Sequence, residues 1–409
     1  MNNINNLKMN LKVSYEQNDY TQSLSIAESI VKLHDVNNKN NSYEYYMDLY
    51  NLAFLQQKLY KYLLAIKGYK KIIQSIDNEF YNQKPSRIIT PNFDKSNKFT
   101  PEFQRENKKE IDMLKLVINS YNSLGLCYSK NSSKVEISLA YFEKALHLSE
   151  VVLSKKGYPH EDLTCMILHN MGCLNYDLEN FNKAIEFHER ANKLKNIGNT
   201  NHIDILNFLS YSYESLGELD LALENSSKAL SIIKKIEGIN SDEYLANLYN
   251  MSKLYQKSGK YELALKNYSQ IYNLLSKKNF TEDSESIIFY LIETLNKIGD
   301  CHIHLKRYED AIKIQQKALP LIKRIVGETH IYYASNLRKI ADIYYILKDY
   351  TNALLLYKSE NLIKKELYGI YNKEYIKSIL NLINLYIIVD DKDNTEMLID
   401  YLLGSINFD

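Results

Sequence analysis

The sequence predicts an all-α fold, a right-handed superhelical solenoid of about eight helix-turn-helix repeats. Glycine and proline are scarce, at 12 and 5 of 409 residues, which favours long helices over a turn-rich sandwich or barrel. A small residue recurs along the chain with a spacing of about 42 residues, which is typical of a repeat array. The apolar residues beside each copy recur at intervals of three and four, which is helical spacing.

Each repeat is organised around one position, usually a small residue, that we name the anchor. In the copy "KIADIYYILKDYTNALLLY" the anchor is Ala341, with Tyr344 three residues later, Tyr350 nine later and Ala353 twelve later. A large residue at the anchor would force the two helices of a pair apart. Because one pair cannot bury its apolar face alone, successive pairs are expected to stack. The anchors are Ala53, Gly125, Gly172, Ser210, Ser252, Gly299, Ala341 and Ile383.

The turn between the two helices of a pair is expected seven residues after the anchor. Gly217 and Gly259 occupy this place, where a left-handed helix C-cap is favourable for glycine. Other copies have Glu179, Lys306 or Lys348 there. A residue other than glycine in that conformation costs about 1 kcal/mol, which packing can offset.

The start of each first helix is also marked. A glycine lies fourteen or fifteen residues before four of the anchors, and a polar residue follows it by three positions. Ser and Asn are preferred N-caps, and His can take the same turn. The cluster "GETH" at residues 327–330 therefore predicts a helix start rather than a catalytic or metal-binding site. The expected N-caps are His160, Ser241, His330 and Asn372.

The order of small residue, Tyr, aromatic residue and two Ala positions resembles the tetratricopeptide repeat, as in "MGCLNYDLENFNKAIEFHERA" and "IGDCHIHLKRYEDAIKIQQKA". The 42-residue spacing, with "VGETHIYYASNLRKIADIYY", resembles the long repeats of kinesin light chains. The resemblance is closest over residues 112–403, weaker over 43–78 and weakest over 8–36. Kinesin light chains have an N-terminal heptad coiled coil that binds the motor heavy chain, and no sustained heptads precede the repeats here.

Three segments are therefore expected. Residues 1–77 form degenerate tetratricopeptide-like helices, residues 78–109 form a flexible insertion, and residues 110–409 form the kinesin-light-chain-like array. The insertion contains three of the five prolines, Pro85, Pro91 and Pro101, and it lacks helical periodicity.

Composition limits the classes of partner. The 51 basic and 50 acidic residues give a formal net charge of +1, so no global field would recruit nucleic acid or an anionic membrane. The apolar runs are too short to span a bilayer. Four cysteines without CxxC spacing, and an N-terminus without a signal-peptide pattern, favour a reducing cytoplasmic setting. We therefore expect neither nucleic-acid binding nor membrane insertion.

No constellation in the sequence points to catalysis. There is no phosphate loop, Rossmann glycine pattern or nucleophile elbow. In "DCHIH" the two histidines, His302 and His304, are two residues apart and would point to different faces of a helix, whereas helical zinc pairs use spacings of three or four. We therefore expect no catalytic residue, no cofactor and no metal.

The tetratricopeptide resemblance implies that residues three before, one after and five after each anchor line a concave groove, the last position including Lys257 and His304. Asn122, Asn207 and Asn296 would suit such a groove, because a carboxamide can donate to and accept from an extended peptide backbone. In kinesin light chains such Asn residues bind cargo peptides, and basic neighbours recognise acidic side chains. The candidate partner-binding residues are Asn122, His169, Asn207, Tyr211, Tyr249, Lys253, Asn296 and Arg338.

The expected function is that of a non-enzymatic scaffold or adaptor that binds a peptide or partner helix in this groove. The resemblance implies cytoskeletal motor or cargo proteins as partners. Two alternatives stay open at this point. The chain could be a structural subunit permanently assembled in a larger complex, or a regulatory sensor that responds to a peptide or small ligand.

Overall fold

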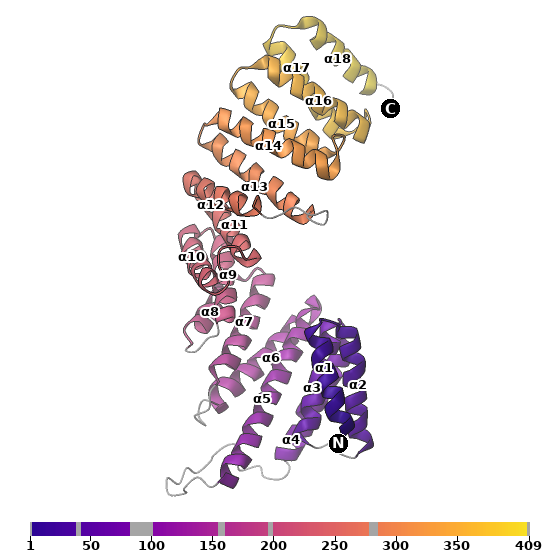
Figure 1. The fold of residues 1–409 in the computed structure, drawn as a ribbon, viewed down its shortest axis with the longest axis vertical. Coiled ribbons are helices and arrows are strands. Elements are labelled where there is room, and N and C mark those ends of the chain that lie inside the picture. Colours follow the sequence, from indigo (N-terminus) through magenta and orange to yellow (C-terminus); the bar gives the residue numbers. More distant parts are fainter. Residues whose placement is uncertain are drawn as a thin grey trace. The chain divides into compact units, whose positions relative to one another are not determined.

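The computed structural model describes residues 2–37, 42–81, 101–153, 160–194, 199–277 and 285–406, and within these ranges the chain is helical without strands (Figure 1). Contacts divide the chain into two units, residues 1–216 and 217–409. In unit 1 the α-helices are α1 (Asn2–Glu16), α2 (Tyr20–Val36), α3 (Tyr43–Lys58), α4 (Tyr62–Tyr81), α5 (Pro101–Ser129), α6 (Val135–His147), α7 (Glu161–Asp177), α8 (Phe181–Asn192) and α9 (Asn199–Ser215). A 3-10 turn (Ser132–Lys134) precedes α6 and a π-helical segment (Leu148–Leu153) follows it.

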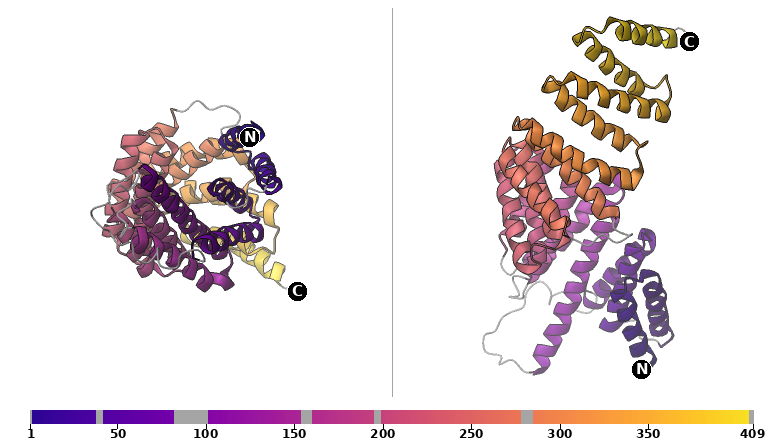
Figure 2. Two further views of the ribbon diagram at one scale, coloured as in Figure 1. Left: turned by 90° about the horizontal axis from the view of Figure 1, so that it is seen from below. Right: turned by 45° about the horizontal axis from the view of Figure 1, so that its top comes forward.

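Unit 2 continues the same architecture. Its helices are α10 (Leu219–Ile236), α11 (Asp242–Lys257), α12 (Tyr261–Leu275), α13 (Glu285–His304), α14 (Tyr308–Val326), α15 (Ile331–Ile346), α16 (Tyr350–Tyr368), α17 (Lys373–Ile388) and α18 (Lys392–Ile406). Figure 2 shows the later helices of this unit stacked in chain order.

Within each unit, every helix packs against the helices before and after it in the chain. In unit 1 the first helices of successive pairs also touch, since α3 contacts α5, α5 contacts α7, and α7 contacts α9. One apolar cluster joins Tyr46 of α3, Ile72 of α4 and Met113 of α5, so each pair buries its apolar face against the next one. The predicted all-α solenoid of helix pairs is confirmed. Among the described residues, no helix is both long and apolar enough to cross a membrane.

The anchors are small because a large side chain from the second helix covers them. Gly125 faces the ring of Phe142, Gly172 faces the ring of His188, and Gly299 faces the amide of Gln315. Each partner lies sixteen or seventeen residues after its anchor, and each is fully buried. We name this place the anchor-facing position.

The predicted turns are confirmed. Gly217 and Gly259 have φ of +80° and +71°, and Glu179, Lys306 and Lys348 adopt values between +58° and +61°. The next residue in each of the non-glycine turns donates its N–H to a carbonyl five residues earlier, as in a Schellman cap. The same left-handed turn occurs at Asn18, Tyr60 and Asp390, so α1 and α2 also form a repeat-like pair.

The N-cap prediction is confirmed for three of four residues. His330 precedes α15, and its Nδ1 accepts the Tyr332 N–H at 3.2 Å. Ser241 and Asn372 accept backbone N–H groups at the starts of α11 and α17 in the same manner. His160 occupies the N-cap of α7 without a side-chain cap bond. His330 therefore has a structural task at a repeat junction.

The expected insertion over residues 78–109 lies mostly outside the described residues, which end at Tyr81 and resume at Pro101, and Pro85 and Pro91 are outside them. The flanking helices reach into it, since α4 continues to Tyr81 and α5 begins at Pro101. Proline suits the first position of a helix because its missing N–H would have no intrahelical partner there.

Candidate protein-interaction site

The first helices of the pairs in unit 2 outline three hollows. The basic hollow lies between α11 and α13 and has a volume of about 280 Å³. The central hollow, between α13 and α15, has a volume of about 410 Å³, and the distal hollow, between α15 and α17, about 320 Å³. Each hollow is lined mainly by two successive first helices, and the second helix between them adds Tyr261, Ile322, Ile325, Val326 or Tyr357.

The basic hollow is lined by three lysines and no carboxylate. Lys253 and Lys257 come from α11 and Lys297 comes from α13, so the stacking of two repeats brings their ammonium groups to one opening. At the same opening the rings of Tyr261 and His304 stack with centroids 4.3 Å apart. Such a hollow suits a carboxylate group of a partner.

The central hollow combines apolar walls with amide groups. Phe289, Val326 and Tyr332 are among the residues that line it. At its floor, the Asn296 Oδ1 accepts hydrogen bonds from Lys339 Nζ at 3.2 Å and from Asn336 Nδ2 at 3.5 Å. Because Asn296 lies next to Lys297 in α13, the amide groups of this hollow adjoin the basic hollow.

Tyr249 connects α11 to α13 beside these hollows. Its hydroxyl donates a hydrogen bond to the Glu293 carboxylate, and Glu293 lines the central hollow. Burial raises the pKa of Tyr249 well above its ordinary value, and the Glu293 carboxylate adds to this effect. Tyr249 therefore stays a neutral phenol, and its hydrogen bond links α11 to α13.

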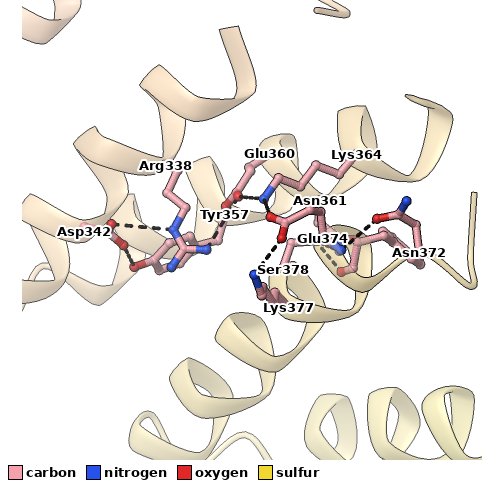
Figure 3. A network of polar contacts seen from close by, with 11 residues as sticks. Arg338, Asp342, Tyr357, Glu360, Asn361, Lys364, Asn372, Glu374, Lys377 and Ser378 are labelled. Carbon is pink, nitrogen blue, oxygen red and sulfur yellow. Dashed lines mark hydrogen bonds and ion pairs between the residues drawn. The ribbon is translucent and has the colours of Figure 1, made fainter. Parts of the chain in front are cut away.

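In the distal hollow, the Arg338 guanidinium lies 3.6 Å from the Asp342 carboxylate and 3.7 Å from the buried Glu360 carboxylate (Figure 3). Tyr357 donates to Asp342 from α16. Two carboxylates thus compensate the charge of Arg338, which makes this hollow less suited than the basic hollow to an acidic group.

The same polar network fastens α16 to α17. Glu360 is fully buried and pairs with Lys364 at 2.8 Å, and Lys364 lies 3.9 Å from Glu374 of α17 (Figure 3). Asn361 donates to Ser378 Oγ at 2.7 Å. Burial raises the pKa of Glu360, and the positive charges of Lys364 and Arg338 oppose that shift.

The four candidate residues of unit 1 lie in different surroundings. Asn122 is only 3% exposed, and its Oδ1 accepts a hydrogen bond from Asn170 at 3.0 Å. His169 is half-buried against Phe208, with ring centroids 5.4 Å apart. Tyr211 packs edge-on against the same Phe208, and Asn207 is half-buried.

In unit 2 the structure brings Lys253 to the basic hollow, Asn296 to the central hollow and Arg338 to the distal hollow. Sequence reasoning missed two cations, Lys297 and Lys339, which line the first two of these hollows. Both lie two residues before an anchor, so the register of the repeat contained a signal for them.

Paired helices with a left-handed turn at a fixed place in each pair, stacked in chain order, define a helical repeat protein. The tetratricopeptide repeat family model matches residues 202–277 and 290–359, so this part of the chain consists of tetratricopeptide repeats. Repeats of this kind form extended surfaces that bind other proteins, which supports an interaction scaffold in general.

Solved structures resemble the chain at low identity. A protein of Podospora anserina described as a kinesin light chain with nearly identical TPR-like repeats is 14% identical, with a TM-score of 0.42, and the match covers 50% of this chain and 96% of that one. BtubC (BKLC) from P. vanneervenii is 16% identical, with a TM-score of 0.29 and coverage of 67% and 92%. The apo form of RapI is 15% identical, with a TM-score of 0.41 and coverage of 59% and 96%. No curated protein matches the chain.

Proposed function

We propose that this chain is a non-enzymatic interaction scaffold that binds an extended, acidic peptide segment of a partner protein along the first helices of unit 2. The observation that carries the proposal is the basic hollow, in which Lys253, Lys257 and Lys297 converge without a lining carboxylate. A carboxylate side chain there would form charge-assisted hydrogen bonds, which are stronger than neutral ones.

The central hollow supplies the second half of the proposed recognition. The half-buried Asn296 amide can bond a peptide backbone, whereas Asn336 is buried and bonds Gln315. The rings of Phe289 and Tyr332 offer apolar contact to a neighbouring side chain. Because both hollows include side chains of α13, one extended segment can occupy them together. The resemblance to kinesin light chains would make such a segment a cargo peptide, and the four free cysteines agree with the cytoplasmic setting that we propose.

A selection of random twelve-residue peptides on the intact chain tests this function. We expect the selected peptides to be enriched in Asp and Glu and to lose binding as salt is raised. Binding should also be lost when the same peptides are offered to the Lys253→Glu/Lys297→Glu variant. Selected peptides without acidic enrichment, or peptides that bind this variant equally well, would contradict the proposal.

One observation favours a second candidate, a subunit permanently assembled in a larger complex. The α17–α18 pair exposes large apolar side chains, among them Ile387 at 58% and Met397 at 57%. Exposed apolar residues gathered on one helix pair are typical of a surface that a partner covers. Isolation of the chain from its own cells followed by native mass spectrometry tests this. A stoichiometric partner that resists high salt supports a permanent assembly, and a chain isolated alone speaks against it.

A further inference from the structure

Helices α7 and α8 bring three metal-ligating side chains together in unit 1. His169 and Cys173 are four residues apart on α7, which places them on one face of the helix. His188 approaches them from α8, and its ring lies edge-to-face with that of His169 at 5.3 Å. One ligand atom from each of the three residues lies within 4.8 Å of the others.

The spacing of these atoms fits a tetrahedral metal ion. The Cys173 Sγ lies 3.5 Å from His169 Nε2. A tetrahedral zinc ion with ordinary Zn–S and Zn–N bond lengths places those two ligand atoms about 3.6 Å apart. The pair on α7 therefore needs little adjustment to share one ion.

The two ring nitrogens of His188 are buried, so they are candidates for binding a ligand. The His188 side chain is fully buried, and neither ring nitrogen makes a hydrogen bond of regular geometry. The backbone of Ala184 and of His169 lies close enough to act on its pKa, but not in that geometry. At the anchor-facing position of other repeats, Tyr268 donates to Gln256 and Tyr357 donates to Asp342. Gln315 accepts from Asn336 through Oε1, although its Nε2 has no partner, so only His188 lacks a regular hydrogen bond at every polar atom among these four. Packing over Gly172 explains why a ring fills this place, but it leaves the two buried nitrogens without a regular hydrogen bond, which costs free energy.

The chemistry of the three groups is that of a zinc site. Burial lowers the pKa of His188 to about 3, and electrostatic repulsion from His169 lowers it further. The imidazole is therefore neutral and has a lone pair for a metal. Burial raises the pKa of the Cys173 thiol to about 12, so metal binding would displace its proton to solvent. The carboxylates of Asp177 and Asp204 act electrostatically on Cys173, so negative charge adjoins the cluster.

We propose that His169, Cys173 and His188 form a tetrahedral zinc site, whose fourth position is open to water. One thiolate and two imidazoles favour zinc over magnesium or calcium, which prefer oxygen ligands. The ion links the first helix of this repeat to its second helix. It also fixes His169, one of the residues expected to face a partner.

Titration of the reduced, metal-stripped full chain with Co²⁺ tests the site, because tetrahedral Co²⁺ with a thiolate ligand gives intense visible bands and a near-ultraviolet charge-transfer band. We expect one Co²⁺ per chain, displaced by Zn²⁺. Cys173→Ser should abolish the charge-transfer band, and His188→Gln should weaken binding at least about tenfold. Gln is a suitable replacement because Gln315 fills the equivalent place over Gly299.

Cys165→Ala and exposed His147→Gln serve as matched controls in the same unit and should leave the spectrum unchanged. Circular dichroism checks that each variant keeps its helices. A wild-type chain without a tetrahedral Co²⁺ spectrum would overturn the proposal. So would a charge-transfer band that persists in Cys173→Ser, or an unchanged Co²⁺ affinity in His188→Gln, because the three-ligand site requires both residues.

Discussion

The ring of Phe142 lies so close over Gly125 that a Cβ on residue 125 would come within 2.5 Å of the ring. Gly172 has the same relationship with His188, where the distance would be 2.4 Å. The small anchor of the repeat is thus the place where the second helix packs a buried ring against the first. This contact sets how closely the two helices of a pair can approach.

Gly125→Ala should destabilise the α5–α6 pair by about 1–3 kcal/mol, because the aromatic ring is packed on all sides and must move. The higher helix propensity of Ala offsets about 1 kcal/mol of the steric cost. Hydrogen exchange of the α5 and α6 amides measures the local effect.

Gly299→Ala is the matched control, because the closest atom there belongs to the end of the flexible Gln315 side chain. We expect a smaller loss of protection in α13 and α14. Equal losses at the two glycines would mean that the rigidity of the covering side chain does not set the cost.

At the left-handed turns, replacing glycine should lower stability, and introducing glycine should not. Gly259→Ala should lower the free energy of unfolding by about 1 kcal/mol, purely through backbone strain, since nothing lies within 4 Å of a Cβ at this residue. Lys348→Gly should be neutral or stabilising, because it relieves a φ of +61°. Chemical denaturation followed by circular dichroism checks both signs, and a stabilising Gly259→Ala would contradict the turn assignment.

His330 is a weak N-cap, so its replacement by a better one should strengthen α15. His330→Ser is expected to add up to about 1 kcal/mol to the stability of the helix start, and His330→Ala to remove a similar amount. Amide exchange in the first turn of α15 reports the change. If His330→Ala left this turn unaffected, the cap bond to Tyr332 would have no energetic value.

We expect the protonation of Glu360 to make the free energy of unfolding of unit 2 vary with pH. Burial raises the pKa of Glu360, and the negative charge of Asp342 raises it slightly more. The positive charges of Lys364 and Arg338 lower it, but burial is the larger effect. The folded state therefore holds this proton more tightly than the unfolded chain, whose value is about 4.3. The resulting stability is present below that pH and is lost as the pH rises through the folded pKa.

Glu360→Gln removes the titrating group and with it this dependence on pH. As the pH rises from about 4 to 7, the free energy of unfolding of the wild type should therefore fall relative to that of the variant. Denaturant titrations across this range measure the difference. The exposed Glu366→Gln on the same helix should show no such trend. Parallel curves for the wild type and Glu360→Gln would refute the expectation.

The repeat register could be predicted because it depends on local rules. The turns at Glu179, Lys306 and Lys348 and the cap at His330 follow from their distance to an anchor, and the structure confirms them. The pair α1–α2 has the same turn, at Asn18, yet its anchor position holds the larger Leu11, which hides the pattern.

Features that depend on contacts between helices could not be predicted in the same way. The spacing of His169 and Cys173 was visible on one helix, but the approach of His188 depends on the packing of α8 over Gly172. The basic hollow likewise combines side chains from α11 and α13. Lys257 and Lys297, for example, are forty residues apart in the chain.

The most direct test of the proposed recognition compares affinities for one fluorescein-labelled acidic peptide from the selection. Lys253→Glu/Lys297→Glu places negative charge in the basic hollow and should weaken binding at least about tenfold, because like charges at an interface repel. Lys266→Glu, on the exposed surface of α12, should change the affinity by less than about twofold. Equal affinities of the wild type and the double variant, with helical content intact in both, would contradict the claim that this face binds the partner.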